Sequence, residues 1–208
     1  RLISVTIGNC VTCIDTWAFA QCCKLAEVIN ESRLNITAGS EDNGLVGCYA
    51  KTVHSGKSRI VNQGDFWFIT GDNGVNYLIA YTGTATELTL PENYSGKTYE
   101  ICDYAFYRCS GLTGIVIPDG VTNIGSSAFE KCENLTTVII GNGVTGIGSS
   151  AFMYCGSLTD VTIGSSVTDI GKNAFTFCGS LTSIVIPDNV TNIGSGTFLR
   201  CYNLTNVI

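Results

Sequence analysis

LTGIVIPDGVTNIGSSAFEKCEN, residues 112–134, is repeated three more times along the chain with small changes. The copies are LTTVIIGNGVTGIGSSAFMYCGS at 135–157, LTDVTIGSSVTDIGKNAFTFCGS at 158–180 and LTSIVIPDNVTNIGSGTFLRCYN at 181–203, and LTNVI at 204–208 starts another. A fixed period of 23 residues is typical of a stacked repeat architecture. The sequence therefore predicts a repeat solenoid.

Each repeat contains two short apolar patterns that predict strands. Ile115 and Ile117 are two residues apart, so both side chains point to the same face of a strand. Val121 and Ile124 form a second short extended segment, which follows the turn residues at 118–120. We expect equivalent strands of successive repeats to lie about 4.8 Å apart and to form parallel sheets.

The third part of each repeat, residues 126–132 in the first copy, is too short for an independent helix. We expect one helical or 3₁₀ turn that directs Ala128, Phe129 and Cys132 into the core. A single repeat buries too little apolar surface to offset the entropy of ordering its backbone, whereas stacked repeats share a continuous core. Phe recurs at 106, 129, 152, 175 and 198, and Cys recurs at 109, 132, 155, 178 and 201.

The same register is found near the start of the chain, over residues 2–30, and is interrupted between 31 and 100. The chain opens and closes inside a repeat without a polar cap, which predicts a segment of a longer array. We predict a single leucine-rich-repeat solenoid domain over 1–208, with repeats at 1–38, an inserted island at 39–85 and repeats at 86–208.

The island is predicted to contain a β-hairpin. Two runs rich in β-branched and aromatic residues, at 66–70 and 75–81, are joined by Gly71-Asp72-Asn73-Gly74, a strong hairpin turn. The island is short for an independent core, so we interpret it as an insertion into the solenoid.

Composition argues against several classes of protein. With 45% hydrophobic and 13% charged residues, the chain has the composition of a folded globular protein. Its net charge of −6 argues against nucleic-acid binding, which depends on clustered Lys and Arg. No apolar run approaches the roughly 18 residues of a membrane-spanning helix.

The eleven cysteines fall into two groups. Cys10, Cys13 and Cys23 lie where other repeats carry polar residues, and Cys48 and Cys102 lie in or just beyond the island. These five are compatible with free thiols, disulfides or metal ligands. Because no set of metal ligands recurs with the repeats, no metal and no cofactor are expected. The remaining six follow Phe by three residues and are expected to be buried free thiols: Cys22, Cys109, Cys132, Cys155, Cys178 and Cys201.

Catalytic groups are sparse in this sequence. Cys48 and His54 could be interpreted as a nucleophile and a base, but one such pair six residues apart carries little information. A surface loop is the simpler interpretation. Since no convergent acid and base residues recur, we do not expect an enzyme.

The unit Leu-Thr-x-Val-x-Ile-(Pro/Gly)-x-x-Val-Thr-x-Ile-Gly-x-x-Ala-Phe-x-x-Cys resembles the 23-residue leucine-rich repeat of the BspA-like surface-antigen family. The match covers residues 2–30 and 101–208, and the interrupting segment also resembles islands of that family. The resemblance implies a curved solenoid that is secreted or displayed at the cell surface. It also implies adhesion to host extracellular-matrix proteins or to other cells.

Between the inward positions of each first strand, the alternate residues should face solvent, as Gly114 and Val116 do in the first copy. A nearly continuous apolar stripe on this face is a candidate contact surface. The candidate binding residues are Val116, Ile139, Asp160, Thr162 and Val185. The alternative site is the aromatic island, with Trp67, Phe68, Tyr77 and Tyr81, although these side chains are more simply expected to pack the hairpin against the solenoid.

We therefore predict a protein-binding or adhesion module that is secreted or located at the cell surface. The expected partner is a protein, such as an extracellular-matrix or cell-surface protein, with no nucleic acid and no membrane span in this segment. The alternative function is a structural spacer in a surface protein, without a ligand of its own.

Overall fold

The computed structural model describes residues 2–15, 17–20, 22–41, 47, 48 and 50–208. Across these residues the regular secondary structure is β-strand, and no helix is present. The described part of the chain accordingly has no helix of the length and hydrophobicity needed to cross a membrane. The chain divides into two compact units, Arg1–Ile79 (unit 1) and Ala80–Ile208 (unit 2).

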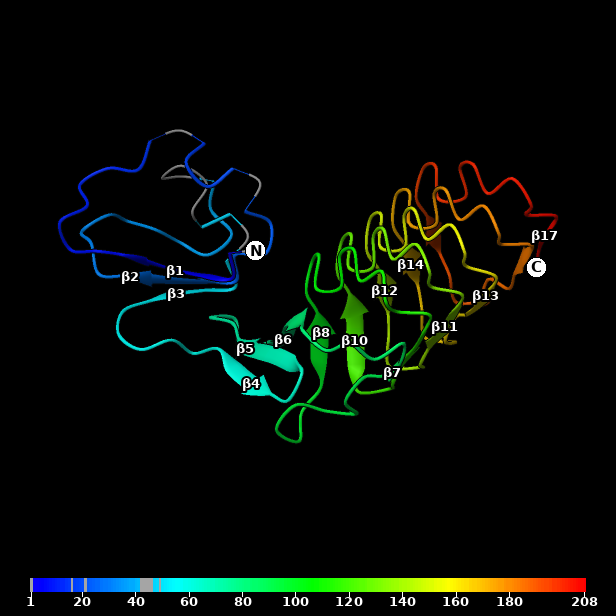
Figure 1. The fold of residues 1–208 in the computed structure, drawn as a ribbon, viewed down its shortest axis with the longest axis horizontal. Helices are drawn as coiled ribbons and strands as arrows, with labels where there is room; N and C mark the ends of the chain where they lie inside the picture. Colours follow the sequence, from blue (N-terminus) through cyan, green and yellow to red (C-terminus); the bar gives the residue numbers. More distant parts are fainter. Residues whose placement is uncertain (1, 16, 21, 42–46, 49) are drawn as a thin grey trace. The chain divides into compact units, whose positions relative to one another are not determined.

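In unit 2 the first strands of successive repeats form a parallel sheet (Figure 1). Residues one repeat apart pair directly, as Gly114 does with Thr137. Ile115 and Ile117 are buried, as their spacing predicts. The strands are β7 (Glu87–Thr89), β9 (Gly114–Ile117), β11 (Thr137–Ile140) and β13 (Asp160–Thr162), and β15 (Ser183–Ile184) pairs in parallel with β17 (Asn206–Val207).

The second strands of the repeats form another parallel arrangement in unit 2. Val121 and Ile124 are fully buried, and Ile124 pairs with Ile147 one repeat later. Both predicted strand types and the repeat solenoid are thus confirmed. The strands are β8 (Tyr99–Ile101), β10 (Val121–Ile124), β12 (Gly146–Ile147), β14 (Asp169–Ile170) and β16 (Asn192–Ile193).

The helical or 3₁₀ turn predicted at 126–132 is wrong. This segment is a series of β-turns, in which the N–H of Glu130 donates to Ser127 O and the N–H of Cys132 donates to Phe129 O. Ser127 and Lys131 adopt left-handed conformations, with φ of 52° and 62°. A residue with positive φ interrupts a right-handed helix but suits the third position of a type II turn.

Hydrogen bonds between repeats explain why turns replace a helix. The N–H groups of Ser127, Phe129 and Lys131 donate to carbonyls one repeat later, each at 2.8 Å. The N–H groups between them bond within their own repeat. In an α-helix the N–H groups point along the helix axis toward carbonyls of the same segment, so they could not bond sideways to the neighbouring repeat. The acceptors are Ser149, Ala151 and Met153.

The Phe side chains of successive repeats stack through the core of unit 2. The Phe129 and Phe152 ring centroids are 5.1 Å apart, and those of Phe152 and Phe175 are 5.3 Å apart, with the rings within 4° of parallel. All three side chains are fully buried. Parallel displaced rings at this spacing attract one another in addition to burying apolar area. The stack also includes Tyr81, Phe106 and Phe198.

A ladder of Cys side chains runs beside the rings. The Cys155 thiol donates to Phe129 O at 3.3 Å, and the Cys178 thiol donates to Phe152 O at the same distance. Burial raises the pKa of the Cys155 thiol well above its usual range, so the thiol keeps the proton that it donates. Cysteine therefore serves here as a small apolar residue with one weak donor.

Unit 1 contains a parallel sheet of three strands, and its third strand lies inside the predicted island at 39–85. Parallel pairing therefore continues past the predicted start of the island. Island residues 42–46 and 49 lie outside the described part of the chain. The strands are β1 (Ser4–Ile7), β2 (Glu27–Asn30) and β3 (Thr52–His54), and the core around them includes Ile7, Leu25, Val28, Ile36 and Ala50.

The predicted β-rich runs of the island form β5 (Phe66–Thr70) and β6 (Asn76–Tyr81). At the turn between them, the N–H of Gly71 donates to Val75 O and the N–H of Gly74 donates to Gly71 O. An additional strand, β4 (Val61–Gln63), pairs antiparallel with β5. The assignment of residues 1–208 to one solenoid domain stays a prediction.

Phe152 lies in the middle of the ring stack, so replacing it tests the core directly. Phe152→Ala should lower the free energy of unfolding of unit 2 by about 3–5 kcal/mol, because the stacked rings on either side leave little room for collapse. Chemical denaturation measures the change, with Thr162→Ala on the exposed face as a control expected within about 0.5 kcal/mol. A loss below about 1 kcal/mol for Phe152→Ala would contradict its burial.

Candidate functional site

Four of the five predicted strand-face residues lie on the outward side of the sheet formed by β7, β9, β11 and β13, whereas the fifth, Val185, directly follows β15. Val116 pairs with Ile139, and Ile139 pairs with Thr162, so these side chains follow one another across the strands. Ile139 is 42% exposed, whereas Val116 is half-buried. We call this line the apolar row, and its paired members are Thr89, Val116, Ile139 and Thr162. We include Val185, which occupies the same repeat position one repeat after Thr162, directly follows β15 and is 59% exposed.

A second outward line, the acidic row, runs beside the apolar row and consists of Glu87, Gly114, Thr137 and Asp160. Gly114 was expected to face solvent but is buried, because the Glu87 carboxylate lies over it. A Cβ atom at Gly114 would lie 1.9 Å from Glu87 Oε2, so glycine makes room for this carboxylate. Thr113 Oγ1 donates to Glu87 Oε1 at 2.7 Å. The two rows together form the strand face.

The aromatic island residues are mostly buried. Phe68 is fully buried, and Tyr77 and Tyr81 are 8% and 6% exposed. The Tyr81 ring stacks on Phe106, with centroids 5.6 Å apart. Trp67 is half-buried, and its Nε1 is buried without a hydrogen-bond partner in the described residues. These side chains contribute to packing and leave little ring surface for a ligand.

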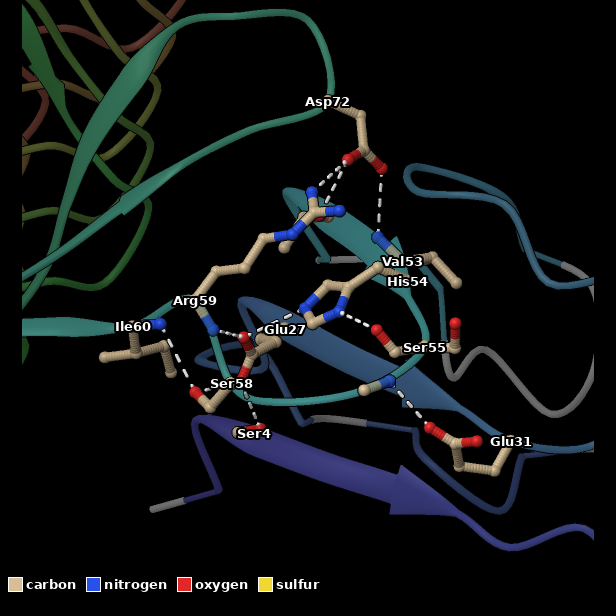
Figure 2. A network of polar contacts seen from close by, with 12 residues as sticks. Ser4, Glu27, Glu31, Val53, His54, Ser55, Ser58, Arg59, Ile60 and Asp72 are labelled. Carbon is tan, nitrogen blue, oxygen red and sulfur yellow. Dashed lines mark hydrogen bonds and ion pairs between the residues drawn. The ribbon is translucent and has the colours of Figure 1, made fainter.

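Unit 1 contains a buried polar network that the sequence did not reveal (Figure 2). Its centre is Glu27, whose side chain is fully buried on β2. The hydroxyls of Ser4 and Ser58 donate to Glu27 Oε2 at 2.7 and 2.6 Å. The backbone N–H of Arg59 donates to Oε1, and His54 Nε2 lies 3.1 Å from the same atom.

The hydrogen bonds around Glu27 lower the pKa of its carboxyl group. Burial raises the pKa, but the hydrogen bonds from two hydroxyls, one backbone N–H and the imidazole outweigh that effect, and the pKa lies below its usual range. The carboxylate is therefore ionised at neutral pH. A buried carboxylate is tolerated only when its oxygens are hydrogen-bonded, as they are here.

A second carboxylate joins the island turn to β3. Asp72 accepts hydrogen bonds from Thr52 Oγ1 at 2.7 Å and from the Val53 N–H at 3.0 Å. The Arg59 guanidinium lies 3.1 Å from Asp72 Oδ1 (Figure 2). Burial raises the pKa of Asp72, but these contacts lower it by more. Arg59 thus contacts Asp72 through its side chain and Glu27 through its backbone.

Glu27, His54 and Ser58 are the residue types of a serine hydrolase triad, but their geometry differs from it. In a triad the hydroxyl bonds to the imidazole, which acts as its base. Here the Ser58 hydroxyl bonds to the carboxylate, and the second imidazole nitrogen, Nδ1, faces Ser55 O at 3.1 Å. Neither nitrogen of His54 is directed at a nucleophile. This is a poor arrangement for a catalytic site.

In the part of the chain that the structure describes, no two cysteines are joined by a disulfide. Cys10 and Cys13 are exposed, and Cys10 lines a hollow of about 340 Å³ together with Arg33 and Leu34. In the described residues, no three His, Cys, Asp or Glu side chains converge to hold a metal ion. Cys132, Cys155, Cys178 and Cys201 are buried as predicted, whereas Cys22 and Cys109 are half-buried, and Cys102 is also buried.

Aromatic and cationic side chains line the outer edge of the turns in unit 2. Lys131 Nζ lies over the rings of both Tyr107 and Tyr154, at 5.8 and 5.6 Å. Tyr154 stacks on Phe177 at 4.5 Å, and the Arg200 guanidinium covers Phe177 at 4.9 Å. Neighbouring side chains occupy these ring faces, so the line stabilises the stacking of repeats and offers little aromatic surface to a partner.

Glu27 illustrates what sequence reasoning missed. In the repeat register, Leu25 corresponds to Leu112, so Glu27 corresponds to Gly114 and would be expected to face solvent. It is buried because residues 55–59 cross over it. The available signal was a short polar segment, Ser55-Gly56-Lys57-Ser58-Arg59, directly after a strand. Nothing in its composition indicates where it folds back.

Thiol-reactive probes should distinguish the exposed and buried cysteines. In the folded chain, Cys10 and Cys13 should be labelled rapidly, whereas Cys155 and Cys178 should react only on unfolding, because burial blocks access and raises the pKa of both thiols. Mass spectrometry of labelled peptides identifies the sites. Rapid labelling of Cys155 in the native state would contradict the register of the core.

Acid should destabilise unit 1 through Glu27. Since the folded pKa lies below the ordinary value of about 4.3, the ionised carboxylate stabilises the fold above that pH, and stability falls as pH drops below it. Glu27→Gln should lower the neutral-pH unfolding free energy by about 3–5 kcal/mol and flatten this dependence. Both Trp residues, Trp17 and Trp67, belong to unit 1, so fluorescence follows its urea unfolding.

The matched control for this titration is Glu87→Gln, an exposed carboxylate of unit 2 at the equivalent row position. It should leave the Trp-detected transition unchanged from pH 3 to 7. If wild-type unit 1 keeps the same unfolding free energy across that range, the role assigned to Glu27 is wrong.

Solved structures of bacterial leucine-rich repeat proteins are similar to this chain. The Treponema pallidum leucine-rich repeat protein is 31% identical, with a TM-score of 0.67, over 71% of this chain and 70% of that chain. A leucine-rich cell surface protein of Faecalibacterium prausnitzii is 35% identical, with a TM-score of 0.64, over 73% of this chain and 43% of that one. A Bacteroides ovatus leucine-rich repeat protein is 28% identical, with a TM-score of 0.62, over 71% and 40%.

A comparison with curated protein sequences found no match. The sequence profile described as "BspA type Leucine rich repeat region" matches in six copies, over residues 1–43 and 76–208. These ranges cover most of the chain, and they include both the three-part repeats of unit 2 and the first strands of unit 1. The chain therefore belongs to the BspA-type leucine-rich repeat family.

Proposed function

We propose that this chain is an adhesion module that binds a protein partner through the strand face of unit 2. The observation that carries the proposal is the aligned apolar row, in which Ile139 and Val185 are 42% and 59% exposed. Val116 and Ile139 are direct partners on neighbouring strands, so their side chains form one contact area. Contiguous apolar surface with a polar margin is typical of protein contact sites.

The carboxylates beside the apolar row restrict the class of protein that could bind there. Glu87 and Asp160 are exposed carboxylates of the acidic row, and the chain carries a net charge of −6. Complementary potentials favour a partner with basic side chains beside an apolar surface. Glu87 is held by the Thr113 hydroxyl, so its carboxylate is already oriented before a partner arrives.

In unit 1, a segment of the same chain packs against the equivalent side of the strands. At the position of Glu27, residues 55–59 of the same chain cross the strands and donate a hydroxyl and a backbone N–H to the carboxylate. The equivalent positions of unit 2 include the exposed Glu87. An extended segment with hydroxyl, N–H or cationic donors is therefore the class of ligand that this proposal favours.

Location at the cell surface is part of the same proposal. The Faecalibacterium relative is described as a leucine-rich cell surface protein, and it shares 35% identity with this chain. The chain spans 43% of that protein, so activities of the whole relative do not transfer to it directly. The alternative is a structural spacer, which is favoured by the half-buried Val116 and by Thr162 interrupting the apolar row.

Charged substitutions on the apolar row should separate binding from folding. Ile139→Lys and Val185→Glu should change the unfolding free energy by no more than about 0.5 kcal/mol, because both side chains are exposed. Each should weaken binding to an immobilised extracellular-matrix protein about tenfold or more if the row is desolvated at the interface. Surface plasmon resonance against a panel of such proteins measures this.

Ile193→Lys is the matched control, since Ile193 is 47% exposed on β16 of the other sheet. It should leave binding unchanged. Trp67→Ala tests the aromatic island: if it abolishes binding while the row variants bind normally, the site is the island. If the wild-type chain binds no protein of the panel, the spacer function is favoured and the proposed function fails.

A further inference from the structure

The hollow of about 340 Å³ in unit 1 is formed by two turns that follow neighbouring strands. β1 and β2 are parallel, and Ile7 at the end of β1 pairs with Asn30 at the end of β2. The residues after both strands therefore come together at the same end of the sheet. The lining consists of Asn9, Cys10, Val11 and Thr12 from the first turn and of Arg33 and Leu34 from the second.

Hydrogen bonds fix the second turn. Asn30 Nδ2 donates to Leu34 O at 2.9 Å, and Asn30 Oδ1 accepts from the N–H and the hydroxyl of Ser32 at 3.1 and 2.6 Å. The Ser32 hydroxyl in turn accepts from the Leu34 N–H at 3.1 Å. The Glu31 N–H donates to Ile7 O at 2.9 Å and so ties this turn to the first strand. The backbone of this side of the hollow is thus held in one conformation.

The first turn is fixed by shorter-range contacts. The Val11 N–H donates to Gly8 O at 3.0 Å and closes the turn. The Cys10 thiol donates to Asn9 Oδ1 at 3.3 Å. Thr12 is exposed and adds a hydroxyl to the lining, which can donate one hydrogen bond to a bound molecule.

The Arg33 guanidinium supplies the positive charge of the lining. Within the described residues, this guanidinium makes no ion pair and no hydrogen bond. Arg59, by contrast, is paired with Asp72. The nearest carboxylate in the sequence, that of Glu31, accepts the Gly56 N–H at 2.7 Å. A guanidinium with no protein partner at the edge of a hollow presents a planar fork of N–H donors to an anion.

These groups suit a carboxylate better than a more highly charged anion. A guanidinium binds a carboxylate through two parallel N–H···O bonds. One cation, in a chain of net charge −6, offsets one negative charge but not the two of a phosphate. A volume of about 340 Å³ lies within the range of roughly 300–1,000 Å³ of small-molecule pockets, so it holds more than the carboxylate. Val11 and Leu34, both half-buried, provide apolar surface for the rest of such a molecule.

We propose that this hollow binds a carboxylate attached to a short apolar group. Arg33 is the counter-ion, Thr12 is a further hydrogen-bond donor, and Val11 and Leu34 contact the hydrocarbon. A small free acid and the C-terminal end of a polypeptide present this same chemistry. The site lies in unit 1 and uses none of the residues of the strand face of unit 2, so the two proposals stand or fall separately.

Two cysteines of the chain make the test specific to this site. Cys10 is an exposed thiol that lines the hollow, whereas Cys13 is an exposed thiol that does not line it. Alkylation of the whole chain by iodoacetamide is followed at both positions by mass spectrometry. In about 50 mM sodium 3-methylbutanoate, Cys10 should react about threefold more slowly or less, as for a Kd of about 25 mM or tighter, and Cys13 should react at an unchanged rate. The neutral 3-methylbutanamide, in NaCl of equal ionic strength, should protect neither thiol.

A dipeptide distinguishes the two sources of the carboxylate. Acetyl-glycyl-leucine carries the same branched hydrocarbon and a C-terminal carboxylate, and its C-terminal amide is the neutral control. Stronger protection of Cys10 by the dipeptide acid than by 3-methylbutanoate indicates the end of a polypeptide. The reverse order indicates a small acid. Both results support a carboxylate site.

Variants of Arg33 test the counter-ion. Arg33→Gln should abolish protection of Cys10, because it removes the charge, whereas Arg33→Lys keeps the charge without the paired donors and should retain part of the protection. Arg33 is exposed, so both variants should fold, which Trp fluorescence of unit 1 checks. Equal slowing of Cys10 and Cys13, equal protection by acid and amide, or full protection in Arg33→Gln would overturn the proposal. Unprotected Cys10 in the wild type with both acids would overturn it as well, and the wild-type comparison decides the matter if a variant does not fold.

Discussion

The structure of unit 2 depends on hydrogen bonds between residues one repeat apart. They are made in both kinds of strand, and also in the turns, where alternate N–H groups such as that of Phe129 donate to the next repeat. This requirement explains why the third part of the repeat is a chain of β-turns with left-handed residues such as Lys131. Those conformations cost energy for a residue with a Cβ atom, and the bonds to the next repeat offset that cost.

The same register places identical side chains of successive repeats above one another. The consequences differ between the core and the solvent-exposed face of the strands. Inside, stacking allows Phe to recur at every level with centroids about 5 Å apart, and the Cys thiol beside it bonds to a carbonyl of the preceding repeat. On the solvent-exposed face, stacking aligns the equivalent exposed residues of neighbouring repeats in a row, as with Val116 and Ile139 on the strand face. The proposed binding surface thus consists of positions that the core leaves unconstrained.

The two units differ at the outward strand position that Glu27 occupies in unit 1 and Glu87 occupies in unit 2. In unit 1 residues 55–59 cover Glu27, and the carboxylate is kept ionised by donors from three segments of the chain. In unit 2 the carboxylate of Glu87 is exposed and bonded to the Thr113 hydroxyl. A buried carboxylate needs several donors to offset its desolvation, whereas an exposed one has water. The burial of Glu27 therefore depends on residues 55–59, a segment outside the repeat pattern.

The sequence by itself determined the solenoid, its two strand types and the inward side of each strand, because period and alternation are local patterns that stacking preserves, as Ile115 and Val121 show. It also identified the outward position of Ile139 and Val185. Only the tertiary structure decided that the 126–132 segment is turns, since its hydrogen bonds are made to another repeat, and that β3 extends parallel pairing into the island. Likewise, Glu27 and His54 gain their contacts from residues far apart in the sequence, which no local pattern connects.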